Sequence, residues 1–586
     1  MRKRRYWVFV LSILLFCIST TRVLGATPEE LDELGKAVTP EGLSLKKDDM
    51  NSYFEYTPSF EDGTLNHSTI KTGLNKKYPS SDAVQLTDDV KQLSSIWSNV
   101  DKGNYINTKI PQTLSMWLYF GHATNPADGI AFVLQSDPRE TKAISTYKGS
   151  VVPGETLGVW GPDIDGSQSS TAVVAAGAIQ KSWALEFDTF LNRYNKAGEG
   201  SYFDYTFNSS ISGNQHMAFN YPAQTSAYVK EDIDGGYGYE LNHSNGRKYK
   251  KFTNYYSAYV YEDDNNDIRT NLNLTHSNSG EDSWHHLTVN YLPPTDGTNN
   301  ATLTYSFNDK KIDGTPGSML TTEKDLPYTN TTNLDLTKVL PTDKNGVIID
   351  NRLRYGFTGS TGKYASLNMA VFETMPSLVN ASSDAKVYNI SQGSREIKSG
   401  DRVTYDNNLM KFSYNLNYLT GDNELRNVVA KITLPSNIAY AKEGIIGNVI
   451  YSDGKVEPVP VSEVTDNVLT HKLTRTMNDK LKGAKLEITG VAKTDKSGGY
   501  EQDTNVASAH ATLMGDLYKG DVNTPQFTIA KAPRHLSIRP ISLLTQSVRF
   551  GNPLHFDGAM SYDDNTAIQN KNMSILIKCN TKVRQN

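Results

Sequence analysis

The chain has 586 residues, enough for about two to four domains, and a formal net charge of −5. No basic stripe follows its first few residues, so the sequence argues against a nucleic-acid partner. Tyrosine is abundant, with 33 residues, and lysine-rich helical patterns are scarce. This composition favours a β-rich protein whose surface contacts polar ligands.

The first 26 residues have the three parts of a secretory signal peptide. A basic start at residues 2–5 precedes an apolar run over residues 7–18, and the small residues Gly25 and Ala26 follow. The apolar run is short for a membrane span, which leaves an uncleaved anchor as the alternative. We therefore expect a secreted chain that has no membrane segment after cleavage.

Cleavage at this position would remove Cys17 and leave only Cys579. A secreted chain of this size with one cysteine cannot rely on internal disulfides. Its domains must be held by core burial or by metal ions. The pattern favours a bacterial exported protein over an animal one.

Four further segments follow the signal peptide. Residues 27–49 are charged and are expected to form a linker. Residues 50–376 show short alternating runs rich in β-branched and aromatic residues, which predict an antiparallel β-sandwich. Residues 385–531 repeat this pattern at the spacing of an immunoglobulin-like sandwich, expected to be a spacer domain. Residues 532–586 resemble the opening strands of a further, partial β module.

The stretch "WALEFDTFLN" carries the first sign of chemistry. In an extended strand Glu186, Asp188, Phe190 and Asn192 share one face. Two neighbouring carboxylates on such a face repel each other. They are compensated by a bound cation, by a shared proton at a catalytic site or by exposure to water. The strand alone does not distinguish these three cases.

The neighbouring motifs extend this pattern. Upstream are "NPADGIAFVLQ" and "PGETLGVWG", and downstream are "SYFD" and "GNQHMAFNYP". Together with "EFDTF" and its following Asn, these blocks resemble the L-type lectins, the family of legume seed lectins and secretory-pathway mannose lectins. The resemblance covers roughly residues 50–376. It implies a concanavalin-like jelly roll of two large antiparallel sheets.

The resemblance also implies metal ligands. Asp188 would bind Ca²⁺ through both carboxylate oxygens, Phe190 through its carbonyl and Asn192 through its side-chain oxygen. Asp204 is the expected final acidic ligand, with Glu199 as the alternative. Glu186 and His216 match a second site for a transition metal such as Mn²⁺, in keeping with the preference of histidine for softer cations.

A sugar pocket is implied beside the calcium. The family holds a cis peptide before its key aspartate, here between Ala127 and Asp128, and Asp128 would accept hydrogen bonds from two sugar hydroxyls. The remaining expected sugar contacts come from three loops: Gly154, Glu155, Asn192, Tyr194, Lys363 and Tyr364. The family's Gly-Gly-x-Leu-Gly element is replaced here by "GETLG". In this loop the backbone N–H of Glu155 would donate a hydrogen bond to the sugar.

Other polar clusters are interpreted as structural. His285 and His286 alternate across a strand and cannot share a ligand face. The acidic residues 261–267 lack the glycine and the distal glutamate of an EF-hand, so a solvated turn is favoured over a calcium loop.

These observations predict a secreted, calcium-dependent carbohydrate-binding protein, an adhesin on the surface of a Gram-positive bacterium. Its partners would be glycans on host or neighbouring cells, and association with the cell wall is a further expectation. One alternative is a glycoside hydrolase of the same fold. That function needs a second glutamate two or three residues beyond the aspartate, where Phe190 and Leu191 stand. The other alternative is a structural stalk with a degenerate lectin domain.

Overall fold

The structure is a computed structural model. It describes residues 39–48, 51–205, 215–241, 255–256, 273–275, 283–317, 327–497, 500–531, 536–541, 551–553, 555 and 557–562. The expected signal peptide, the acidic residues 261–267 and most of the expected partial module lie outside these ranges. Within them, no helix is both long and apolar enough to cross a membrane.

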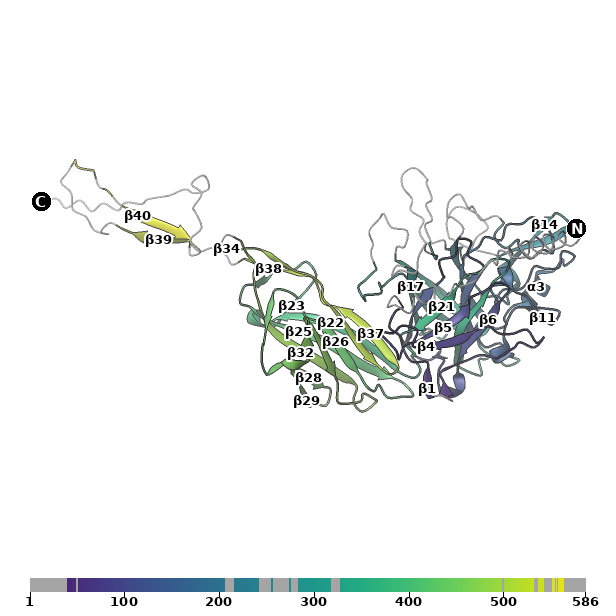
Figure 1. Ribbon diagram of the computed structural model, residues 1–586, viewed down its shortest axis with the longest axis horizontal. Coiled ribbons are helices and arrows are strands. Elements are labelled where there is room, and N and C mark those ends of the chain that lie inside the picture. Colours follow the sequence, from purple (N-terminus) through teal and green to yellow (C-terminus); the bar gives the residue numbers. More distant parts are fainter. Residues whose placement is uncertain are drawn as a thin grey trace, which may run out of the picture.

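The N-terminal part of the chain, up to Phe372, forms two large antiparallel sheets (Figure 1). The first sheet has the spatial order β16 (Tyr255–Tyr256), β13 (His216–Asn220), β12 (Ser182–Asp188), β9 (Gly129–Gln135), β20 (Arg352–Ser360), β6 (Leu93–Ser98) and β3 (Phe54–Glu55), with β7 (Ile106–Asn107) beside β20. The second sheet has the order β19 (Tyr328–Asp335), β18 (Asn300–Phe307), β17 (Trp284–Leu292), β8 (Gln112–Tyr119), β21 (Asn368–Phe372), β5 (Asp82–Thr87) and β4 (Thr69–Thr72). We call this unit the first sandwich.

The period-2 pattern of β12 shows how the layers form. Trp183, Leu185 and Phe187 point into the core between the two sheets. Ala184 points to the opposite side, where it packs in a second apolar cluster under a layer of loops. Glu186 and Asp188 lie on this same side because they continue the alternation. Both faces of the strand are therefore buried, and its two carboxylates lie inside the protein.

The loop layer contains short regular elements. They are the helix α3 (Thr171–Gly177), the hairpin of β14 (Tyr228–Ile233) and β15 (Gly236–Leu241), the small hairpin of β10 (Thr146–Tyr147) and β11 (Ser150–Val151), and the 3₁₀ turn η4 (Gly154–Thr156). Ser170 caps α3 by accepting a hydrogen bond from the N–H of Ala172. Trp160 packs beneath this layer with 2% of its surface exposed. The short helix α5 (Leu336–Val339) follows β19.

The prediction of a linker over residues 27–49 is wrong for the part that the structure describes. Leu43 and Leu45 are fully buried in the core of the first sandwich. The N–H of Leu43 donates to the carbonyl of Phe372 at 2.8 Å, and β1 (Lys46–Asp48) pairs with β2 (Asn51–Ser52). The stretch is predicted as a linker because it is mostly charged, but Leu43 and Leu45 are two residues apart and therefore point to the same face.

A second sandwich follows from Asn380. Its largest sheet has the order β23 (Arg395–Ile397), β22 (Asn380–Asn389), β25 (Leu409–Thr420), β32 (Gly483–Ala492), β28 (Ile445–Tyr451) and β29 (Val456–Pro460), with β27 (Ile438–Tyr440) beside β32. Opposite it are β30 (Val464–Thr465), β31 (Val468–Lys472), β26 (Val429–Thr433), β36 (His510–Gly515) and β37 (Tyr518–Asn523). A small sheet contains β24 (Thr404–Tyr405), β38 (Phe527–Ala530) and β35 (Thr504–Val506), and two hairpins pair β33 (Lys496–Ser497) with β34 (Tyr500–Glu501) and β39 (Leu536–Pro540) with β40 (Gly558–Tyr562).

The two sandwiches meet at a buried group of charges, which we call the joint. Glu373, immediately after β21, is fully buried and accepts hydrogen bonds from Lys310 at 2.6 Å and from Lys519 of β37 at 2.8 Å. Both lysines also bind Asp521, at 2.8 Å and 3.0 Å. A cleft of about 400 Å³ opens beside these groups, and His286 also lines it. The charges in this cleft are already paired with one another.

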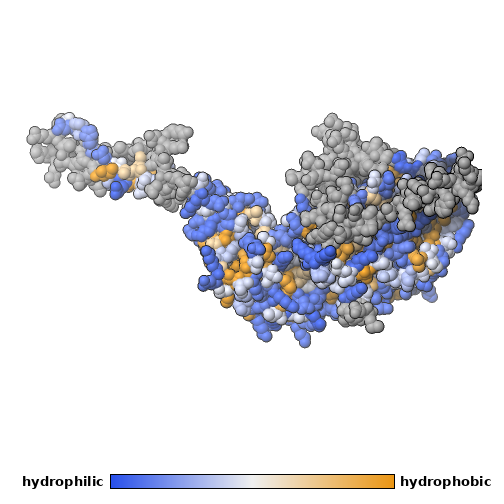
Figure 2. All heavy atoms as spheres, in the orientation of Figure 1, coloured by the Kyte–Doolittle hydropathy of each residue, from blue (hydrophilic) through white to orange (hydrophobic). Residues whose placement is uncertain are grey.

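The prediction of an all-β chain, with a jelly-roll sandwich followed by an immunoglobulin-like one, is confirmed. His285 and His286 both make buried polar contacts, in keeping with the structural role that the sequence predicts for them. His285 contacts Asn308 at 2.8 Å, and His286 contacts Glu373 at 3.1 Å. On the face shown in Figure 2, the second sandwich is mostly hydrophilic with scattered apolar patches.

Candidate functional site

The predicted ligands gather at one end of the first sheet, because the register of three neighbouring strands brings them there. Asp188 is the last residue of β12, and it pairs with His216 at the start of β13 and with Gly129 at the start of β9. Gly129 also pairs with Ser360 at the end of β20. The loops that begin or end at these residues therefore meet over one edge of the sheet.

Asp128 is fixed at this edge by its backbone. The peptide bond between Ala127 and Asp128 is cis, as the resemblance to the L-type lectins implied. The N–H of Asp128 donates to the carbonyl of Ser360 at 3.1 Å, and its own carbonyl accepts the N–H of Thr189 at 2.9 Å. The next residue, Gly129, has a φ of +144°, and a β-carbon there would lie 2.2 Å from the carbonyl oxygen of Phe187. Only glycine allows this close approach of β9 and β12.

A compact group of possible metal ligands lies next to Asp128. One ligand atom from each of Asp188, Asp204 and His216 lies within 4.8 Å of the others, and all three residues are buried. The Nε2 atom of His216 is 3.6 Å from Oδ1 of Asp204 and 4.0 Å from Oδ2 of Asp188. It is also 3.5 Å from Oε1 of Glu186. The structure thus brings together four of the predicted metal ligands.

The loop after β12 folds back to complete this group. The N–H of Asn192 donates to Oδ2 of Asp204 at 2.9 Å, and the N–H of Asp204 donates to the carbonyl of Asn192 at 3.0 Å. The N–H of Phe190 donates to Oδ1 of Asp188 at 2.7 Å. Glu199, the alternative ligand, instead pairs with Lys196 on the surface at 2.7 Å. The local hydrogen bonds therefore favour Asp204 over Glu199.

The electrostatics of the group fit a bound cation. Burial raises the pKa of Asp188 well above its usual value, and the charges of Asp204 and Glu186 raise it further. The side-chain oxygen Oδ1 of Asn192 is buried and has no hydrogen-bond partner among the described residues. Oxygen donors of this kind suit a hard divalent cation such as Ca²⁺, and His216 adds a nitrogen donor that a transition metal prefers.

Trp160 is a residue of the site that the sequence analysis missed. Its indole N–H donates to Oε2 of Glu186 at 2.6 Å, and both side chains are buried. This hydrogen bond fixes the carboxylate of Glu186 toward His216. The motif "VWG" lies in the second of the lectin-like blocks, but nothing local to it indicates a partner 26 residues away.

The carboxylate of Asp128 is buried, with 5% of the residue exposed. Burial raises its pKa to about 7, although a hydrogen bond from the Gly362 N–H acts in the opposite direction. Its Oδ2 atom has no hydrogen-bond partner among the described residues. A β-carbon at Gly362 would lie 3.2 Å from this atom, so the glycine keeps the space beside it open.

Three of the other predicted sugar contacts, Gly154, Lys363 and Tyr364, lie in loops at this edge of the sheet. Gly154 is tied to the edge by its carbonyl, which accepts the hydroxyl of Ser360 at 2.5 Å. The ring of Tyr364 lies 6.0 Å from that of Phe190, and Nζ of Lys363 lies 5.5 Å from the same Tyr364 ring. The contact between Tyr364 and Phe190 links the loop after β20 to the loop after β12.

Tyr194 and the side chain of Glu155 do not take part in these contacts. Tyr194 is 56% exposed, and no contact joins it to Asp128 among the described residues. The side chain of Glu155 points into the protein, where Oε2 accepts the N–H of Tyr202 at 2.9 Å. Only the backbone of Glu155 is left to serve the role that the sequence predicted.

No protein-family model and no curated protein matches the chain. Among solved structures, it is similar to peanut lectin, with 15% identity over 54% of this chain and 93% of the lectin and a TM-score of 0.24. It is similar to the metal-free lectin I-B4 of Griffonia simplicifolia, with 18% identity over 54% and 89% of the two chains and a TM-score of 0.22. It is also similar to BcpA, the major pilin subunit of Bacillus cereus, with 12% identity over 44% and 60% of the two chains and a TM-score of 0.19.

Proposed function

We propose that the chain is a secreted carbohydrate-binding protein whose sugar site depends on Ca²⁺. The observation that carries this proposal is the convergence of Asp188, Asp204 and His216 beside Asp128 at one end of the first sheet. Two buried oxygens there, Oδ2 of Asp128 and Oδ1 of Asn192, have no hydrogen-bond partner among the described residues. Buried polar atoms are rarely left without partners, which supports a ligand at this edge.

In this proposal Asp188, Asn192 and Asp204 hold the calcium, together with the carbonyl of Phe190. Glu186 and His216 hold a second cation such as Mn²⁺. The bound ions would offset the repulsion among these buried carboxylates and fix the loop that carries Asn192. Asp128 then presents its carboxylate to two neighbouring sugar hydroxyls. Asn192 adds a further hydrogen bond from the calcium-ordered loop.

Glycoside hydrolysis is the weaker candidate. Retaining glycosidases need two carboxyl groups about 5 to 5.5 Å apart, on either side of the scissile bond. Glu186 is held by Trp160 and faces the metal-ligand group, and Phe190 and Leu191 stand where a second glutamate would be needed. This arrangement supports binding rather than bond cleavage.

The biological setting is a further part of the proposal. The N-terminal signal pattern supports export, and the second sandwich would be a spacer that holds the lectin-like unit away from the cell. The partners would be glycans on host or neighbouring cells, with the chain acting as an adhesin at the surface of a Gram-positive bacterium. Association with the cell wall would retain it there.

A glycan array probed in Ca²⁺ and in chelator tests the sugar site. The wild-type chain should bind in Ca²⁺ only. Asp128→Ala should lose binding, because loss of a charged hydrogen-bond partner costs about 1.5 to 3 kcal/mol, or roughly ten- to a hundredfold in affinity. Asp101→Ala is the matched control, since Asp101 is exposed on the same sandwich. Near wild-type binding by Asp128→Ala would place the pocket elsewhere.

A further inference from the structure

A second pair of acidic side chains lies beneath the loop layer, apart from the predicted ligands. Glu155 belongs to η4 and is 3% exposed. Its Oε2 atom accepts the N–H groups of Tyr202 at 2.9 Å and of Phe203 at 3.3 Å. Its Oε1 atom is buried and has no hydrogen-bond partner among the described residues. One oxygen of this carboxylate is therefore available to a ligand.

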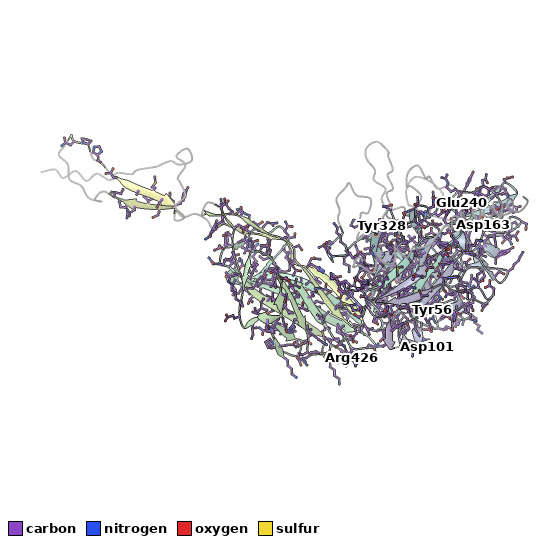
Figure 3. All side chains as sticks on the ribbon, in the orientation of Figure 1. Tyr56, Asp101, Asp163, Glu240, Tyr328 and Arg426 are labelled. Carbon is purple, nitrogen blue, oxygen red and sulfur yellow. The ribbon has the colours of Figure 1, made fainter. Side chains whose placement is uncertain are left out.

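Asp163 is arranged in the same way. It is 2% exposed, and its Oδ2 atom accepts the N–H of Tyr239 in β15 at 3.1 Å. Its Oδ1 atom is buried and lacks a hydrogen-bond partner among the described residues. Figure 3 labels Asp163 near Glu240, in the part of the first sandwich away from the second. Each member of the pair thus has one satisfied and one unsatisfied oxygen.

Gly200 lies next to both acids. Its N–H donates to the carbonyl of Asp163 at 3.0 Å. A β-carbon at this position would lie 3.6 Å from Oε1 of Glu155 and 2.9 Å from a methyl group of Ile164. Gly200 also has a φ of +60°, which side chains rarely adopt. The glycine therefore provides both the turn and the open volume next to Glu155.

No basic side chain compensates this pair among the residues that the structure describes. Burial raises the pKa of Glu155 well above its usual value, and the charge of Asp163 is the next largest cause. Burial likewise raises the pKa of Asp163 to about 7. A buried carboxyl group without a basic partner is either protonated or compensated by a bound cation.

We propose that Glu155 and Asp163 bind a divalent cation of the calcium type, at a site separate from the Asp188, Asp204 and His216 group. The carboxylate oxygens Oε1 and Oδ1 are hard donors, and water would complete the coordination. Glu155 also holds the backbone N–H groups of Tyr202 and Phe203, which directly precede Asp204. A cation at this pair would therefore order the segment that supplies the last acidic ligand of the first group.

Cation stoichiometry tests the proposal without reference to sugar binding. Calcium bound per chain is measured by titration calorimetry, and by elemental analysis after gel filtration. The double variant Glu155→Gln, Asp163→Asn should bind one calcium ion fewer than the wild type. Asp165→Asn is the matched control, because this carboxylate lies two residues from Asp163 and is paired with Ser167 and Lys148. It should leave the stoichiometry unchanged.

The variant Asp188→Asn separates this proposal from the proposed function. It should remove binding at the first group and leave the Glu155 and Asp163 site occupied. Terbium luminescence, sensitised by the nearby Tyr202 and Tyr239, should persist in Asp188→Asn and be displaced by Ca²⁺. It should disappear when Asp163→Asn is added.

Two results would overturn the proposal. The first is an unchanged calcium stoichiometry in the folded double variant, which would mean that the two acids are protonated instead of binding a cation. The second is the absence of terbium luminescence in Asp188→Asn, and this result decides the matter if the double variant does not fold.

Discussion

Asp188 and His216 stand directly opposite each other in the antiparallel ladder of β12 and β13. Because side chains alternate along a strand, a shift of one residue in this pairing would send one of the two to the opposite face. The register of the sheet therefore determines whether the metal-ligand group exists. The buried apolar residues of β12 on the other face fix that register.

Calcium should stabilise the folded chain. The carboxylates of Asp188 and Asp204 are buried together and repel each other when no cation is bound. A ligand that binds only the native state stabilises it by about 2.7 kcal/mol at a hundredfold excess over its dissociation constant. The melting temperature, followed by circular dichroism, should rise from chelator to millimolar Ca²⁺. Most of this rise should be lost in Asp188→Asn and kept in Asp343→Asn, a change at an exposed turn.

The calcium-free chain should become less stable as the pH rises from about 5 to about 7. The folded-state pKa of Asp128 and that of Asp163 are both raised to about 7, against about 3.9 for an unfolded aspartate. The folded state therefore binds more protons than the unfolded state between these values, and stability falls with rising pH. Urea unfolding in chelator at several pH values measures this trend, and a rise in stability over the same interval would contradict it.

The charges of the joint make the free energy of unfolding depend on pH in the opposite direction, and they do so at lower pH. The lysines around Glu373 and Asp521 hold the pKa of both carboxyls below their usual values. The stability that these two carboxylates contribute is complete above their unfolded-state pKa of about 4. It is lost only as the pH falls toward their lower folded-state pKa values. The interval from pH 5 to 7 therefore reports on the buried acids whose pKa is raised, Asp188 and Glu155 as well as Asp128 and Asp163, and not on the joint.

Removing the charge of Glu373 should destabilise the chain strongly. Glu373→Gln leaves Lys310 and the buried Lys519 with less compensation, and breaking a buried ion pair on one side costs about 3 to 5 kcal/mol. Glu396→Gln is the matched control, because Glu396 pairs with Lys398 at the surface and little change is expected. Denaturant unfolding compares the two variants. Equal free energies of unfolding in the two variants would show that the charge of Glu373 contributes nothing to stability.

Purified protein should release no reducing sugar from β-glucans, and Glu186→Gln should not change this result. Glu186 accepts the indole N–H of Trp160 and faces His216, so its oxygens are committed to the metal-ligand group. Steady release of reducing sugar that Glu186→Gln abolishes would establish the hydrolase instead. An unrelated protein from the same purification serves as the background control.

The sequence predicted those parts of the site that follow from local pattern. The alternation of β12 placed Glu186 and Asp188 on one face, and the resemblance to lectins supplied the cis peptide before Asp128 and the choice of Asp204. The sequence could not predict contacts between residues that come together only when the chain folds. The hydrogen bond from Trp160 to Glu186 and the inward side chain of Glu155 depend on how the loop layer packs.

The joint is the clearest contact of this long-range kind. Glu373 and Lys519 are separated by 146 positions, and neither stretch has a pattern that points to the other. Leu43 and Leu45 illustrate the same limit, since only the finished sandwich shows that they belong to its core.

The buried charges of the joint also have a mechanical consequence. Strand β37 holds the second sandwich to the first in addition to the chain itself, because Lys519 binds Glu373 by both its backbone N–H and its ammonium group. Turning one sandwich against the other would break these short bonds together, and both Glu373 and Lys519 are buried. In the adhesin role proposed above, the two sandwiches would then turn as one body, and a force on the chain would reach the proposed sugar site without being absorbed between the domains.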